Sequence, residues 1–80
     1  MTDMALFGQW VKSQRLAMGV RQKDFAKQVY CAAVTLRKIE AGDLRPSSDL
    51  ARIIVEQFGL PPQEQSEMIR LARERSANEL

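Results

Sequence analysis

The sequence predicts an all-α fold built from five helices. Apolar side chains recur at spacings of three and four residues through most of the chain, which is the pattern of an amphipathic helix. Glycine or proline interrupts this pattern at residues 19, 42 and 59–62, where helices are expected to end or begin. No run alternates apolar and polar residues as a half-buried strand does, so we expect helices alone.

Length and composition limit the class of protein. Eighty residues allow one domain with a small core, and we expect it to span residues 1–76, followed by a frayed tail over residues 77–80. The 45% hydrophobic and 28% charged residues indicate a globular protein rather than a disordered one. The chain lacks histidine and has one cysteine, Cys31, which excludes the usual zinc ligand sets, a His-dependent nucleophile pair and an intrachain disulfide. Because no run has the apolar length of a signal peptide or membrane span, we expect a cytoplasmic protein.

The first helix is expected over residues 5–18, because its apolar residues repeat on one stripe. Gly19 would end this helix, since glycine readily adopts the left-handed conformation that follows a helix C-terminus. Trp10 lies beside the stripe and is either a surface platform for a ligand or a residue that packs against another helix. Without a second exposed aromatic residue nearby, we favour packing. The stripe consists of Phe7, Val11, Arg15 and Met18.

Two short helices are expected over residues 22–29 and 33–41, joined by a tight turn. The apolar face of the first is formed by Phe25, Ala26 and Val29. The second helix has two faces of different chemistry. Its inner face is formed by Leu36, Ile39 and Glu40. Its other face is formed by Ala33, Val34, Arg37 and Lys38, and the role of this face decides the function.

Two further helices complete the fold. The fourth is expected to begin at a cap formed by Ser47 or Ser48 and to end at Gly59. The fifth is expected over residues 62–76, because Pro62 suits the first position of a helix. Their expected core faces are Leu50, Ile53, Ile54 and Phe58 in the fourth helix and Gln65, Met68, Ile69 and Ala72 in the fifth.

A set of residues in the second and third helices has a distinctive order and spacing. It consists of Gly19-Val20-Arg21-Gln22, Phe25-Ala26, Val29, Thr35-Leu36 and Ile39-Glu40-Ala41-Gly42. This pattern resembles the helix-turn-helix of the Cro and lambda-repressor (XRE) family. With the flanking helices the resemblance covers most of residues 5–59, and residues 60–76 are similar to N-terminal modules of bacterial regulators. It implies a five-helix lambda-repressor-like DNA-binding domain in which residues 33–41 form the recognition helix.

The resemblance also implies a partner and a role for individual residues. The partner is double-stranded DNA, with the recognition helix in the major groove. Gln22 would contact a phosphate and brace the recognition helix, and Arg45 would hold a phosphate from the following loop. Arg15 and Glu40 would form a structural ion pair between the first and third helices. The expected DNA-binding residues are Arg21, Gln22, Ala33, Val34, Thr35, Arg37, Lys38 and Arg45.

The chain departs from the family pattern in its caps, its turn and its reading surface. The family usually has Ser or Thr in place of Arg21 and Ala32, so each helix lacks a side-chain N-cap, at a cost of about 1 kcal/mol. Arg21 can compensate by gripping a phosphate. Tyr30 replaces a glycine common in the turn, where a positive φ would strain a bulky residue. Ala33 and Val34 can touch a thymine methyl group but cannot read a hydrogen-bond donor or acceptor.

The function that we expect is sequence-specific binding of double-stranded DNA by a bacterial or phage transcriptional regulator or its N-terminal module, as a homodimer or part of a larger regulator. Residues 1–52 carry nine Lys and Arg against five Asp and Glu, whereas residues 53–80 carry three Arg against five Glu, so the helix-turn-helix lies in the basic part. Arg37 and Lys38 must then supply most of the specificity, unless they only form a solvated charged face.

Two other functions remain open. The chain can be a protein-interaction module that kept the fold, lost base-specific reading and docks a partner through Ala33 and Val34. An enzyme is the weakest hypothesis, because the sequence has no phosphate-binding glycine loop and no catalytic constellation, and we expect neither a cofactor nor a metal.

Overall fold

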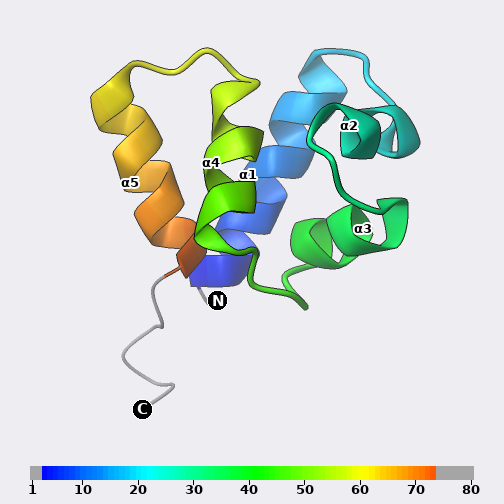
Figure 1. Ribbon diagram of the computed structural model, residues 1–80, viewed down its shortest axis with the longest axis horizontal. Coiled ribbons are helices and arrows are strands. Elements are labelled where there is room, and N and C mark those ends of the chain that lie inside the picture. The colour runs from blue at the N-terminus through cyan, green and yellow to red at the C-terminus, as the bar shows by residue number, and fades with distance from the viewer. Residues whose placement is uncertain (1–2, 74–80) are drawn as a thin grey trace.

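The computed structural model describes residues 3–73, and within this range it contains five helices and no strand. This confirms the predicted all-α architecture, which Figure 1 shows. The expected frayed tail over residues 77–80 and the expected end of the fifth helix over residues 74–76 lie outside the described residues. The helices are α1 (Asp3–Ala17), α2 (Gln22–Gln28), α3 (Ala33–Ala41), α4 (Ser48–Glu56) and α5 (Pro62–Arg73).

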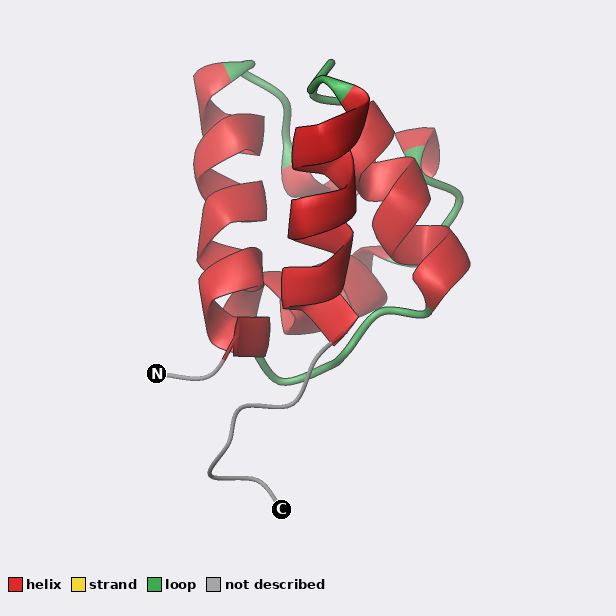
Figure 2. Ribbon diagram, turned by 90° about the vertical axis from the view of Figure 1, so that its left-hand side faces the viewer, coloured by secondary structure: helices red, strands yellow, loops and turns green. Residues whose placement is uncertain are grey.

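The helices are arranged around α1, which packs against α3 on one side and α5 on the other. Helix α4 packs against α5, and α2 packs against α3. Figure 2, turned to face the side of α5, shows this helix between α1 and α4. The pair α2–α3 therefore stands at the opposite end of the molecule from α5 (Figure 1). No helix within residues 3–73 combines the length and the apolar character needed to cross a membrane.

The core draws on all five helices, and each of its side chains is at most 1% exposed. Full burial of one large apolar side chain contributes about 1.5–3 kcal/mol, so these residues are the main stabilising term. In α4 the buried stripe is rotated by about one residue from the predicted one, because α4 also packs on α5: Leu50, Ile53 and Phe58 are only partly buried. The core residues are Phe7, Val11, Phe25, Ala26, Val29, Leu36, Ile39, Ala51, Ile54, Val55 and Ala72.

Trp10 is partly buried and packs against the core, as predicted, and it belongs to a row of aromatic rings. Its indole meets the Phe58 ring edge-on, with centroids 5.2 Å apart and an angle of 82° between the planes. Phe58 in turn stacks on Phe25 of α2 at 5.4 Å and 10°. Pairs of this kind contribute about 0.5–1.5 kcal/mol beyond the area that they bury. The row holds the segment after α4 between α1 and α2.

Two glycines end helices as predicted. Gly19 and Gly42 have φ of 72° and 81°, which glycine adopts without the steric cost of a Cβ. Met18 lies beyond the last residue of α1 and is 47% exposed, so the prediction that it belongs to the buried stripe is wrong.

Other helix boundaries differ from expectation by a few residues. Helix α1 begins at Asp3 rather than at residue 5, and α2 ends at Gln28. Helix α4 ends at Glu56 instead of continuing to Gly59, because the N–H groups of residues 57–59 donate to carbonyls three residues earlier and tighten the last turn. Ser47 caps α4, since its hydroxyl accepts the Leu50 N–H at 3.1 Å.

The turn between α2 and α3 is strained at Tyr30, which has a φ of 61° and is 85% exposed. A non-glycine residue in this left-handed region costs roughly 1–2 kcal/mol, and the exposed phenol buries little in return. We therefore expect Tyr30→Gly to stabilise the protein by about 1 kcal/mol, less the entropy that glycine gains in the unfolded chain. Urea unfolding measures the change. Tyr30→Ala is the matched control, because it removes the ring and keeps the strain; an equal gain in both variants would contradict the assignment of strain to the backbone.

Candidate nucleic-acid interface

Helix α3 presents two faces, as its sequence predicts. Leu36 and Ile39 are fully buried on the inner face. The outer face is exposed, and it carries two cations in its second half. Thr35 is half-buried between the two faces. The exposed residues of this outer face, which we call the α3 surface, are Ala33, Val34, Arg37 and Lys38.

The N-terminus of α3 has an unusual local chemistry. Its N-cap is Ala32, whose backbone is extended and which offers no side-chain acceptor to the first N–H groups of the helix. The first turn contains no acidic residue. The positive end of the helix dipole is therefore not neutralised by a carboxylate of that turn, which favours an anion nearby. The missing side-chain caps at Ala32 and at Arg21, expected from the sequence, are observed.

A buried cluster of polar groups holds α3 from behind. Arg15 Nε and Nη2 donate to Glu40 Oε2 at 2.8 Å and to Glu40 Oε1 at 3.1 Å, in a bidentate pair that joins α1 to α3. Gln22 Nε2 donates to Glu40 Oε1 at 3.0 Å and adds α2 to the cluster. Arg15 Nη1 donates to the Val20 carbonyl at 2.8 Å, which fixes the loop before α2. Glu40 of α3 thus accepts hydrogen bonds from side chains of both α1 and α2, and it ties the three helices together.

Glycine lets α1 and α3 approach each other at the same place. A Cβ added to Gly8 would lie 2.2 Å from the Ile39 carbonyl oxygen and 2.8 Å from the Glu40 carbonyl oxygen. No side chain fits between these backbones. The orientation of the α3 surface is therefore fixed by a side-chain cluster and by a direct backbone contact.

Arg21 and Gln22, two of the residues expected to contact phosphate, differ in the hydrogen bonds that they already make within the protein. Arg21 at the N-cap of α2 has an 81% exposed side chain, and its Nε donates to Asp24 Oδ2 at 2.9 Å, a partner that sequence reasoning missed. An exposed pair of this kind contributes at most about 1 kcal/mol, so a phosphate can compete for the guanidinium. The amide of Gln22 donates one hydrogen bond to Glu40, and its second N–H is the group that a phosphate would use.

The loop that carries Arg45 is anchored by α5. Arg45 is half-buried, and Pro46 beside it is fully buried. Arg73, in the last turn of α5, donates through Nη1 to the Pro46 carbonyl. Sequence reasoning missed this contact, because nothing in a local pattern relates two residues that lie 27 positions apart.

Cys31 sits half-buried in the turn before α3. Burial raises the pKa of its thiol, while a hydrogen bond with the backbone of Leu36 opposes the shift. The raised pKa keeps the thiol protonated at neutral pH, which disfavours a role as a nucleophile.

Comparison with known proteins gives one positive result. A family model described as helix-turn-helix matches residues 11–65, from within α1 to within α5. No curated protein and no solved structure matches the chain. The matched range includes both helices of the interface and more than half of the chain. The chain therefore belongs to the Cro and lambda-repressor (XRE-type) helix-turn-helix family of DNA-binding regulators.

Proposed function

We propose that this chain binds double-stranded DNA sequence-specifically as a bacterial or phage transcriptional regulator, or as its N-terminal module, and that it works in the cytoplasm. The observation that carries the proposal is the α3 surface, whose two cations are exposed on a helix that a buried cluster holds rigidly from behind. A reading helix needs this rigidity, because base contacts depend on side chains held in register with the groove.

The residues of the α3 surface would make two kinds of contact with DNA, apolar contacts and hydrogen bonds. Ala33 and Val34, in the first turn, can make apolar contacts with thymine methyl groups. Arg37 has the planar donor fork that pairs with guanine in a bidentate manner, and Lys38 contacts either a base or the backbone. Phosphate contacts from Arg21, Gln22 and Arg45 would set the register of the helix on the duplex.

One helix-turn-helix unit is small for a regulator. A single module buries roughly 600–1,000 Å² of protein surface and reads only a few base pairs, so useful affinity usually requires a second half-site. We therefore propose that two modules act together, either as a homodimer or within a larger regulator. A duplex selection that yields a palindrome, together with a dimeric mass in solution, would support this arrangement. A single asymmetric half-site bound tightly by a monomer would overturn it.

Binding to random-sequence duplex at several salt concentrations tests the proposal. Binding should weaken steeply between about 50 and 200 mM salt, with a slope of log K against log salt near −0.9 for each phosphate contact. The absence of binding at about 50 mM salt, where non-specific affinity is highest, would overturn the DNA-binding function.

Replacing Arg37 by alanine should relax the preference at one base pair of a selected duplex by about 1–3 kcal/mol, because a bidentate contact to guanine is lost. Competition between the selected duplex and its single-base variants measures this change. Arg52→Ala is the matched control, because it removes the same charge from α4, outside the α3 surface. There Arg52 Nη2 lies 3.4 Å from Asp49 Oδ1. A uniform loss of affinity over all duplexes would instead make Arg37 a phosphate anchor.

A specific observation favours a second candidate function. Tyr30 is 85% and Val34 is 45% exposed, so the N-terminal end of the interface offers apolar area of the kind that protein partners bury. A module that docks a protein through this end would keep the fold, but it would not show duplex binding that weakens steeply with salt. The duplex experiment above separates the two functions.

A further inference from the structure

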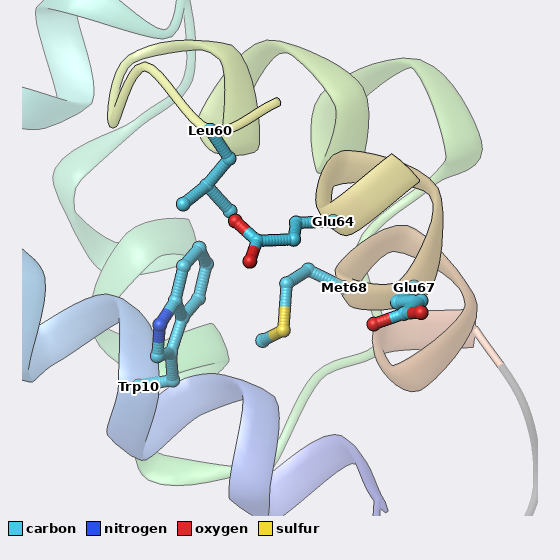
Figure 3. Close-up of a pocket in the computed structure, with 5 residues that line it drawn as sticks. All are labelled: Trp10, Leu60, Glu64, Glu67 and Met68. Carbon is cyan, nitrogen blue, oxygen red and sulfur yellow. The ribbon is translucent and has the colours of Figure 1, made fainter. Parts of the chain in front are cut away.

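A groove of about 310 Å³ lies between α1 and α5, at the far end of the molecule from the α3 surface. Its walls combine one aromatic ring, two apolar side chains and two carboxylates. Figure 3 shows Glu64 and Met68 reaching from α5 toward Trp10 on α1, with Leu60 above them. The lining residues are Trp10, Leu60, Glu64, Glu67 and Met68.

The charge of the groove is of one sign. Both ionisable residues that line it are glutamates, exposed on the first two turns of α5. Within residues 3–73 neither carboxylate makes an ion pair or a side-chain hydrogen bond. Figure 3 shows the Glu64 carboxylate between Leu60 and Met68, near the Trp10 ring, whereas Glu67 lies beyond Met68 and also lines a second hollow with Arg70. The carboxylate of Glu64 is therefore the charge nearest Trp10, and it favours a cationic occupant over a neutral or anionic one.

The aromatic wall is held rigidly. Phe58 meets the Trp10 indole edge-on at 5.2 Å, and Phe7 lies 5.9 Å from it at an angle of 39°. Trp10 therefore presents a fixed, partly buried ring to the groove, and the thioether of Met68 lies beside it. An indole ring is the side chain that attracts organic cations most strongly, through the negative face of its π system.

We propose that this groove binds a small organic cation, a protonated amine that carries an aromatic or alkyl body. The ammonium group would lie against the face of the Trp10 ring, beside the Glu64 carboxylate, and the apolar body would lie along Leu60 and Met68. A bare metal ion fits the groove poorly, because no group of three potential metal ligands occurs within the described residues and an apolar floor offers such an ion nothing. A neutral apolar ligand would leave the carboxylate charges uncompensated.

Trp10 is the only tryptophan of the chain, so its fluorescence reports the occupancy of the groove directly. The probe is 2-phenylethylammonium at neutral pH, and its matched neutral control is 2-phenylethanol, which has the same body without the charge. We expect a saturable change in Trp10 emission with the cation and about tenfold weaker binding of the alcohol, because the cation–π contact with Trp10 and the charge of Glu64 act on the ammonium alone. Equal affinity for both probes, or a quenching that stays linear with concentration, would overturn the proposal.

Variants test the carboxylates separately from the ring. The double change Glu64→Gln/Glu67→Gln should reduce the preference for the cation severalfold, because only the cation–π contact with Trp10 remains, whereas Glu56→Gln, an exposed change of the same charge on α4, should leave the preference intact. Circular dichroism checks that both variants keep their helices. A preference that is unchanged in the double variant would contradict the site. An emission that depends on protein concentration and is reversed by the cation would instead assign the groove to a second copy of the chain and overturn the small-ligand proposal.

Discussion

Replacing Glu40 by alanine is expected to destabilise the protein by about 3–5 kcal/mol, more than the double change Arg15→Ala/Glu40→Ala. Arg15 is only 6% exposed, and without Glu40 it keeps one acceptor, the Val20 carbonyl. The single change therefore leaves a buried guanidinium without its counter-ion, and it also removes the acceptor of Gln22. The double change removes both charges, so the desolvation penalty disappears together with the pair.

Urea unfolding of the wild type, the two single variants and the double variant measures these free energies in one cycle. Glu56→Ala removes a carboxylate from the exposed end of α4 and should change the free energy of unfolding by no more than about 0.5 kcal/mol. A loss in the double variant equal to or greater than that in Glu40→Ala would show that Arg15 and Glu40 do not act as a buried ion pair. Because natural domains are stable by only about 5–15 kcal/mol, Glu40→Ala should also melt at a much lower temperature.

Replacing Gly8 by alanine is the second change with a large expected effect. Alanine is the better helix former by about 1 kcal/mol, so at an open position in the middle of a helix this change would stabilise the protein. Here the new Cβ would lie 2.2 Å from a backbone oxygen of α3, and no rotamer can relieve a clash between a Cβ and a backbone. The two helices must separate, and overpacking of this kind costs about 1–3 kcal/mol or more.

Ser13→Ala is the matched control for this prediction, because Ser13 lies on the exposed side of the same helix. It should be neutral or slightly stabilising, whereas Gly8→Ala should lower the free energy of unfolding by at least about 1 kcal/mol after the gain in helix propensity. Chemical denaturation compares the two. A stabilising Gly8→Ala would mean that α1 and α3 do not approach as closely as the fold requires. The same variant should also weaken DNA binding beyond its loss of folded protein, since α3 would be displaced.

Local patterns predicted much of this fold. The inner face of α3, with Leu36 and Ile39 buried, follows from helical periodicity, and the ends of α1 and α3 follow from the left-handed conformation that Gly19 and Gly42 adopt. The strain at Tyr30 could also be predicted, because the resemblance gave this position a conformation that suits glycine. In each case the feature depends on the conformation of one residue or on the residue spacing within one helix.

Features that depend on contacts between distant segments could not be predicted in this way. Gly8 reads in the sequence as a weak helix former, and only the approach of α3 explains why a side chain is excluded. Arg73 and Pro46 lie 27 positions apart, and no periodicity relates them. The groove beside Trp10 is likewise formed only when α5 folds back on α1. The roles of the residues on the α3 surface stay predictions, because they depend on a partner as well as on the fold.

The contact between Arg73 and Pro46 bears on how long a fragment of this domain must be to keep its fold. The family match ends at residue 65, inside α5, yet Ala72 is fully buried and Arg73 holds the loop next to Arg45. A fragment that stops at the family boundary would lose a core residue and release that loop. The smallest autonomous unit for grafting onto another regulator should therefore extend through residue 73, even though its final turn carries none of the motif by which the family is recognised.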